Sequence, residues 1–270
     1  MRMMENFWFA LGLTVIAGLS TGLGGLFSVV SRRTSATFLS LSLGFSAGVM
    51  LYVSLVEILP KAVESIGEET GEGPAGWWAV AAFFGGMLVI GVIDRLVPSA
   101  INPHEPHTVV DREASIDRRR LMRAGTMTAV AIAIHNFPEG FATFIAGLKD
   151  PSVAIPVALA IAIHNIPEGV AVAVPIRQAT GSRRKAVLWS FLSGLAEPIG
   201  ALVGFLLLMP FLNGVTLGVT FGMVAGIMVF ISLDELLPTA REYGKHHLAV
   251  YGLVAGMAVM AVSLLLFASV

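Results

Sequence analysis

Cysteine is absent from this 270-residue sequence, and charged residues are scarce. Without thiols the chain can form no disulfide, no zinc ribbon and no metal site built on thiolates. Charged residues make up 13% of the chain, whereas a soluble domain of this length usually carries about 25%. The net charge of −1 gives no general attraction to nucleic acid, so we expect no nucleic-acid partner.

Long apolar runs are what the sequence has instead, and its mean hydropathy is +0.82. Uncharged stretches cover Asn6–Ser31, Thr34–Val56 and Gly73–Ile93, among others. A helix needs ~20 apolar residues to cross a bilayer, so these runs predict membrane spans. A buried helix of a soluble protein explains one such run but not several. The first run exceeds the about 7–15 apolar residues of a signal peptide, so we interpret it as a span.

Polar and turn-forming residues divide the chain into eight apolar segments. We therefore predict an all-α membrane protein, with eight transmembrane helices in a single domain that covers residues 1–270. The predicted spans are approximately 7–30, 37–60, 77–98, 122–147, 152–176, 186–209, 213–237 and 248–269. The longest break, residues 99–121, contains proline and charged residues and is predicted to be a loop.

Lysine and arginine predict the orientation of the spans. Fourteen of the 17 basic residues lie in the loops that follow spans one, three, five and seven, at Arg32, Arg33, Arg95, Arg112, Arg118, Arg119, Arg120, Arg123, Arg177, Arg183, Arg184, Lys185, Arg241 and Lys245. Only Arg2, Lys61 and Lys149 lie on the other side. Because basic residues mark cytoplasmic loops, we expect both termini outside and the loop at 99–121 inside.

Two segments of the first half recur in the second half. "GFSAGVMLYVSLVEILPKA" (Gly44–Ala62) and "GMVAGIMVFISLDELLPTA" (Gly222–Ala240) agree at ten of nineteen positions. Ala17–Leu26 and Ser193–Leu202 agree at four of ten. Spans one and two thus resemble spans six and seven, which cross the membrane in the opposite direction.

A third pair lies in the neighbouring, antiparallel spans four and five. "AIAIHNFPEG" begins at Ala131 and "AIAIHNIPEG" begins at Ala160, and nine of the ten letters agree. We infer a 3+2+3 inverted repeat, an arrangement that transporters share and that places their sites near the midplane. Similar composition would explain the matching Gly and Ala residues, but it explains the shared "S-L-x-E-x-L-P" ending poorly.

The two copies of H-N-x-P-E-G carry the chemistry. Residues three and four apart share a helix face, so each copy presents an imidazole, an amide and a carboxylate to one side. These side chains are His135, Asn136 and Glu139 in span four, and His164, Asn165 and Glu168 in span five. Pro138 and Pro167 each remove a backbone N–H and crowd the preceding turn, which predicts a kink beside these side chains.

Buried carboxylates in a membrane require a compensating charge. An ionised Glu at the bilayer centre costs at least ~2.5–3.5 kcal/mol on insertion scales. No Lys or Arg lies between Ala124 and Leu148 or between Pro151 and Ile176. A divalent cation would supply the charge, and two facing helices offer ligands for two closely spaced ions. A single buried His–carboxylate pair, by contrast, is usually a satisfied core contact.

Other polar residues have weaker claims to a metal role. Glu197 in "SGLAEPIG" of span six is a third intramembrane carboxylate, and it breaks the repeat because its counterpart is Thr21. We predict that it completes an oxygen-rich second metal position. Glu57 and Glu235, near the ends of spans two and seven, are interpreted as interfacial, gate or pathway residues. His104 and His107 lie in the loop at 99–121. We predict that they either form a weak cytoplasmic metal site or are simply solvated.

The donor set limits the choice of ion. Imidazole with carboxylate and amide oxygens, and without thiolate, suits Zn²⁺, Fe²⁺, Mn²⁺ or Co²⁺ rather than Cu⁺. We expect these ions as transported substrates and expect no organic cofactor.

At these motifs the sequence resembles the ZIP (Zrt/Irt-like protein) metal transporters, especially their bacterial ZupT-like branch. "HNFPEG", "HNIPEG", "SGLAEP" and "DELLP" carry the resemblance. It implies a permease of the bacterial inner membrane that imports zinc, and also iron, manganese, cobalt or cadmium, by alternating access. It also implies a binuclear centre made by His135, Asn136, Glu139, His164, Asn165, Glu168 and Glu197. Spans one, four, five and six would move against a scaffold that is able to form a homodimer.

Two other functional classes are weighed against a transporter. A metal-gated cation channel or sensor could use the same buried ligands. An intramembrane metalloprotease would need a motif such as H-E-x-x-H, with two His ligands on one helix. Each helix here has one His, and Glu follows neither directly, so we expect a transporter and not an enzyme.

Overall fold

The computed structural model describes residues 6–30, 36–96, 118–149, 151–211, 213–243 and 246–268, and within these ranges it contains helices and no strand. The predicted all-α class is therefore confirmed. The helices are α2 (Phe7–Val30), α3 (Ala36–Val53), η1 (Ser54–Ile58), α4 (Leu59–Thr70), α5 (Glu72–Leu96), α6 (Arg118–Lys149), α7 (Pro151–Thr180), α8 (Arg183–Gly194), α9 (Ala196–Leu208), η2 (Met209–Phe211), α10 (Gly214–Ile231), η3 (Ser232–Leu236), α11 (Leu237–Tyr243) and α12 (His246–Ala268).

Eight helical stretches are long and apolar enough to cross a membrane, which confirms the predicted number of spans. The second stretch, Ala36–Thr70, extends ten residues beyond the predicted end at position 60. It continues because Pro60 falls in the first turn of α4, where proline fits a helix. Gly71 ends it with a φ of 82°, a backbone conformation that favours glycine. Most of the predicted loop at 99–121 lies outside the described residues.

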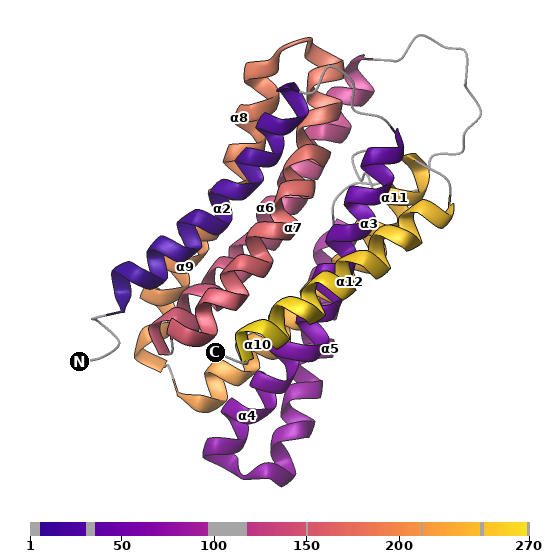
Figure 1. Ribbon diagram of the computed structural model, residues 1–270. Helices are drawn as coiled ribbons and strands as arrows, with labels where there is room; N and C mark the ends of the chain where they lie inside the picture. Colours follow the sequence, from indigo (N-terminus) through magenta and orange to yellow (C-terminus); the bar gives the residue numbers. More distant parts are fainter. Residues whose placement is uncertain are drawn as a thin grey trace.

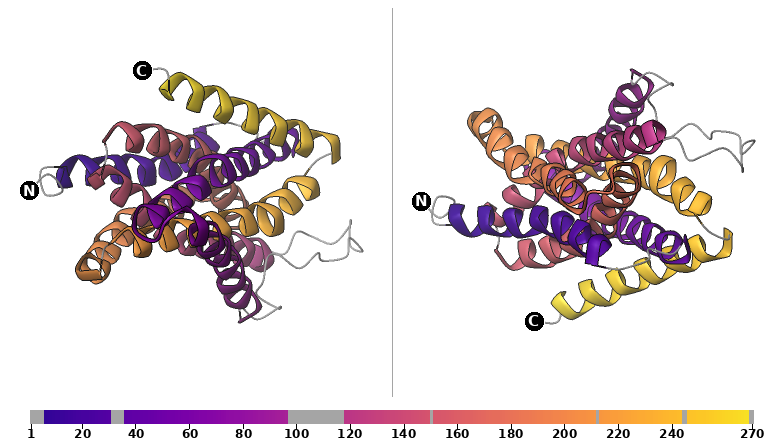
Figure 2. Two further views of the ribbon diagram at one scale, coloured as in Figure 1. Left: turned by 90° about the horizontal axis from the view of Figure 1, so that it is seen from below. Right: turned by 90° about the horizontal axis from the view of Figure 1, so that it is seen from above.

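The helices form two groups (Figure 1). The first group contains α2, α6, α7, α8 and α9, and the second contains α3, α4, α5, α10, α11 and α12. The groups meet where α3 packs on α7 and α10 packs on α6. In the two end-on views of Figure 2, α12 lies along the outer edge of the molecule. Large apolar side chains of α12 and of α5 are exposed, as in lipid-facing surfaces, among them Trp77, Leu88, Val254 and Leu265.

Close helix contacts in the first group occur at glycine and repeat within the chain. A Cβ on Gly24 would collide with the carbonyl oxygen of Ile166, and a Cβ on Gly169 with that of Thr21. The same relation joins Gly200 to the carbonyl of Phe137, and Gly140 to the carbonyl of Glu197. The α2–α7 contact is thus repeated between α9 and α6, at the separations of 176 and 29 residues seen in the sequence.

The second group repeats its contacts in the same way. A Cβ on Gly48 would meet the carbonyl of Leu253, and a Cβ on Gly226 would meet that of Phe83. The α3–α12 contact is thereby related to the α10–α5 contact, which pairs span three with span eight. Sequence comparison did not detect that pair, because a lipid-facing helix needs only to be apolar outside its few contact positions. These repeated contacts support the inverted 3+2+3 arrangement.

Two π-helical turns also lie at equivalent positions in the two halves of the chain. η1 begins at Ser54 and η3 at Ser232, which are 178 residues apart, and each comes shortly before a proline. A π turn accommodates the backbone hydrogen bonds that proline disrupts. The hydroxyl of Ser54 donates to the carbonyl of Met50 at 2.6 Å, and that of Ser232 donates to the carbonyl of Met228 at 2.7 Å.

Candidate metal centre

The two H-N-x-P-E-G motifs lie in the interior of the first helix group. They are carried by α6 and α7, which pack against each other. Both helices continue through Pro138 and Pro167 as single elements, so neither proline ends its helix. The described polar side chains of the motifs are buried: Asn136, Glu139, His164, Asn165 and Glu168.

One imidazole and one carboxylate meet between the two helices. Nε2 of His164 on α7 lies 3.2 Å from Oε1 of Glu139 on α6. The side chains of His164 and Glu139 are 0% and 2% exposed, so the pair is shielded from water. The repeat relates this pair to His135 and Glu168, but the side chain of His135 lies outside the described residues. Its place at the centre stays a prediction.

Backbone carbonyls of neighbouring helices orient the two amides. Nδ2 of Asn136 donates to the carbonyl of Ser193 at 3.3 Å, and Nδ2 of Asn165 donates to the carbonyl of Ala17 at 3.1 Å. Ala17 and Ser193 are again 176 residues apart. Within the described ranges both Oδ1 atoms are buried without a hydrogen-bond partner. An unsatisfied buried acceptor costs about 1–3 kcal/mol, and a metal ion would remove that cost.

Glu197 joins the same cluster from the start of α9. Its Oε1 accepts a hydrogen bond from Nδ2 of Asn165. Its Oε2 is buried and has no hydrogen-bond partner among the residues described. The helix is interrupted at Leu195, between α8 and α9, which lets Glu197 enter in the first turn of a new helix. The predicted third carboxylate therefore lies beside the α7 motif.

The second helix group also reaches the cluster, through Ser46 of α3. Its hydroxyl donates to the carbonyl of His164 at 3.2 Å and lies 3.5 Å from Oε1 of Glu168. The sequence analysis missed Ser46, since a serine in an apolar span gives no signal of what it faces. It likewise missed the carbonyls of Ala17 and Ser193, which act through the backbone.

The cluster is rich in oxygen donors and negative charge. Glu139, Glu168 and Glu197 are buried, whereas no Lys or Arg lies between Ala124 and Leu148 of α6 or between Pro151 and Ile176 of α7. In the part of the chain that the structure describes, no three His, Cys, Asp or Glu side chains come close enough together to hold a metal as they stand. The amide oxygens of Asn136 and Asn165 are further donors of another type, and the side chain of His135 lies outside the described residues.

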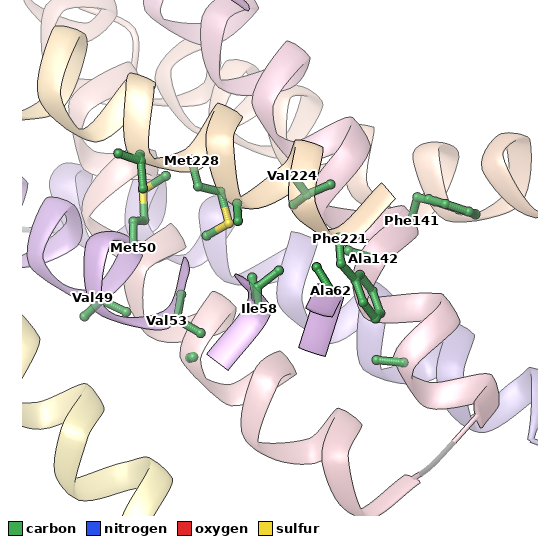
Figure 3. Packing of buried hydrophobic residues seen from close by; sticks show 14 of the residues in the cluster. Val49, Met50, Val53, Ile58, Ala62, Phe141, Ala142, Phe221, Val224 and Met228 are labelled. Carbon is green, nitrogen blue, oxygen red and sulfur yellow. The ribbon is translucent and has the colours of Figure 1, made fainter. Parts of the chain in front are cut away.

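A narrow apolar cavity lies beside Glu139, between the two helix groups. It follows Glu139, Ala142, Thr143 and Ala146 along α6, a distance of ~10 Å at 1.5 Å per residue. Its other walls come from α7, α10, η1 and α4. Figure 3 labels four of the lining residues, which are Ile58, Ala142, Phe221 and Val224. The cavity has a volume of about 20 Å³, against the ~10–15 Å³ that one water needs. A water molecule fits, but a fully hydrated divalent ion does not.

Of the two predicted gate or pathway residues, Glu235 lies near the cluster, within electrostatic range of Glu168. Glu57 is partly exposed and forms an ion pair with Lys61, one turn further along the chain. Glu235, its counterpart in the repeat, is buried in η3. Their predicted gate or pathway role stays a prediction. His104 and His107, the predicted weak cytoplasmic site, lie outside the described residues.

Comparison with known proteins agrees with the motifs. The family model described as "ZIP Zinc transporter" matches residues 6–118 and 104–264. A protein named zinc transporter ZupT from Corynebacterium glutamicum is 66% identical over 260 residues, which cover 96% of this chain and 99% of that protein. Its namesake from Streptococcus mutans is 60% identical over 265 residues, covering 98% of this chain and 100% of that protein. The chain belongs to the ZIP family, a family of transporters and not of enzymes.

Proposed function

We propose that this protein imports divalent metal ions across the membrane, with zinc as the main substrate. The relatives that match nearly the whole chain are named zinc transporters. The observation that carries the proposal is the cluster of three buried carboxylates with two amide oxygens that lack hydrogen-bond partners within the described ranges. Such a cluster is costly in a membrane unless a cation neutralises it.

Two adjacent positions for the ion follow from the donor types. His135 and His164 with Glu139 and Glu168 would form a position rich in nitrogen, which suits zinc. Asn136, Asn165 and Glu197, with the same two carboxylates, would form an oxygen-rich position. Oxygen ligands accept Fe²⁺ and Mn²⁺ as well, so we include iron, manganese, cobalt and cadmium as further substrates.

The division into two helix groups supports transport by alternating access. The first group carries all seven proposed ligands, and the second supplies the other walls of the cavity. Movement of one group against the other would open the cluster to each side in turn, as in other carriers built from inverted repeats. The cavity leads from Glu139 toward the end where α6 finishes, which the charge pattern assigns to the outside.

We also propose an orientation, a membrane and contact surfaces for the protein. The bias of Lys and Arg favours termini outside and the loop at 99–121 in the cytoplasm. The membrane would then be the inner membrane of a bacterium, with residues 1–270 acting as one transporter domain. The exposed apolar faces of α5 and α12 would contact lipid or a second copy of the chain in a homodimer.

Zinc uptake by cells that express defined variants tests the proposal. Glu139→Gln and Glu168→Gln each keep the shape of the side chain and remove its charge, so we expect initial uptake to fall at least about 100-fold. Glu72→Gln, at an exposed position in the first turn of α5, is the matched control and should keep uptake. Normal uptake by both buried variants, at equal amounts in the membrane, would refute the proposal.

A carrier is distinguished from a channel by counterflow. Proteoliposomes preloaded with unlabelled zinc should accumulate labelled zinc transiently if the site alternates between the two sides. A pore that is open to both sides at once would show no such accumulation.

A further inference from the structure

A buried threonine of α2 occupies the place that Glu197 holds in the other half of the molecule. The repeat aligns Thr21 with Glu197, 176 residues later. The helix contacts agree with this alignment. A Cβ on Gly140 of α6 would collide with the carbonyl oxygen of Glu197. A Cβ on Gly169 of α7 would collide in the same way with the carbonyl oxygen of Thr21. Because each glycine directly follows the glutamate of an H-N-x-P-E-G motif, Thr21 meets α7 as Glu197 meets α6.

A shared carbonyl places Thr21 beside the cluster. In an α-helix each carbonyl accepts the N–H of the residue four positions later, so the carbonyl of Ala17 accepts the N–H of Thr21. The same carbonyl accepts a hydrogen bond from Nδ2 of Asn165 at 3.1 Å. The backbone of Thr21 and the amide of Asn165 therefore bond to one oxygen atom. Since Asn165 also donates to Glu197, Thr21 belongs to the wall of the cluster.

The hydroxyl of Thr21 lacks the partner that a threonine in a helix usually finds. Such a hydroxyl commonly donates to the carbonyl four residues back, as Thr14 of the same helix does at 2.9 Å. For Thr21 that acceptor is the carbonyl of Ala17. This oxygen already accepts hydrogen bonds from the side chains of Ser20 and Asn165. Within the described residues Oγ1 of Thr21 is buried without a hydrogen-bond partner, so it is available to a ligand.

We propose that Thr21 supplies a neutral oxygen ligand to the oxygen-rich metal position and thereby determines its specificity. Glu197 gives this position a carboxylate from α9, and Thr21 gives it a hydroxyl from the equivalent place on α2. The hydroxyl adds an oxygen without adding charge. It therefore favours an ion that prefers oxygen ligands, such as Mn²⁺, and contributes little to Zn²⁺ at the position rich in nitrogen. This inference rests on the proposed import function and its two metal positions.

Binding of Mn²⁺ and Zn²⁺ to the purified protein tests this role without transport. Thr21→Val keeps the shape of the side chain and replaces its hydroxyl with a methyl group. We expect this variant to raise the Kd for Mn²⁺ about tenfold and to change the Kd for Zn²⁺ less than about twofold. Thr21→Ser keeps the hydroxyl and should keep Mn²⁺ binding. The electron paramagnetic resonance signal of free Mn²⁺ measures the first Kd, and competition with a fluorescent zinc chelator measures the second.

Thr14→Val is the matched control in the same helix. Thr14 is as fully buried as Thr21, but its hydroxyl donates to the carbonyl of Ala10. Its replacement should therefore change neither Kd. Thr21→Ala removes the hydroxyl without putting a methyl group in its place. It should raise the Kd for Mn²⁺ as Thr21→Val does, which guards against a defect in packing that the new methyl group alone would cause.

The outcomes separate this role from the import function. An unaltered protein that binds no Mn²⁺, or an unchanged Kd for Mn²⁺ in both Thr21→Val and Thr21→Ala, would overturn the role of Thr21. Equal losses of Mn²⁺ and Zn²⁺ binding in these variants, or an equal loss of Mn²⁺ binding in Thr21→Ser, would do the same. In proteoliposomes the ratio of Mn²⁺ to Zn²⁺ uptake should fall in Thr21→Val by about the factor seen in binding. An unaltered protein that binds both ions but transports neither would instead overturn the import function alone.

Discussion

Individual residues at the centre are held by the backbone of helices that carry no ligand motif. The amide nitrogens of Asn136 and Asn165 donate to carbonyls of α8 and α2, which turns both Oδ1 atoms away from those helices. The sequence predicted the ligand types from spacing alone, because i and i+4 positions share a helix face. It could not predict the groups that orient them, since backbone carbonyls have no sequence signature.

Ser46 is the residue whose removal most directly tests this orientation. Ser46→Ala deletes a hydroxyl that bonds to α7 beside Glu168, so we expect the KM for zinc to rise about three- to tenfold, with less change in the maximal rate. Ser40→Ala removes another buried hydroxyl of α3, one without a hydrogen-bond partner in the described ranges, and should leave the KM unchanged. An equal effect of both substitutions on the KM would show that Ser46 only packs.

Helices of the first group approach each other so closely that only glycine fits at their crossings. Sequence comparison predicted that spans one and six are equivalent, on four matches in ten positions. The matching residues include Gly24 and Gly200, and these are the positions at which each helix crosses a carbonyl of α7 or α6. The equivalence of spans three and eight depends on contacts with α10 and α3, which a single sequence does not reveal.

Glycine substitutions test these crossings. Gly24→Ala and Gly200→Ala each drive a Cβ into a backbone carbonyl that cannot move aside, so we expect a loss of about 1–3 kcal/mol for each. Gly12→Ala, in the same helix as Gly24, meets no atom within 4 Å and should be neutral or slightly stabilising. Thermal unfolding in detergent checks both expectations. Equal midpoints for Gly12→Ala and Gly24→Ala would contradict the close contact.

The whole molecule consists of two helix groups, and within each group the close glycine contacts occur twice. The number of spans was predictable because each crossing needs an apolar run whose minimum length the bilayer sets. Hydropathy did not predict the grouping, because apolar helices of similar length do not specify their neighbours. The resemblance to the ZIP transporters did imply it, since it places spans one, four, five and six together. The extension of α3 and η1 into α4 was missed as well, since Pro60 suggested an end and the structure places it in a helix start.

The charge pattern predicts which side of the membrane each loop faces. In a chain without other cysteines, Glu64→Cys should react with an impermeant thiol reagent in intact cells, because α4 is expected to lie outside. Arg184→Cys, in the first turn of α8, should react only after the membrane is permeabilised. The reverse pattern would place both termini inside.

The central claim is that buried carboxylates on two facing helices are neutralised by divalent metal. Elemental analysis and zinc titration of the purified protein measure this directly. The account predicts about two zinc ions per chain, and a loss of nearly all bound zinc in the Glu139→Gln, Glu168→Gln double variant, with the helical content unchanged. A purified protein that binds no zinc, or a double variant that binds as much as the unaltered chain, would contradict it.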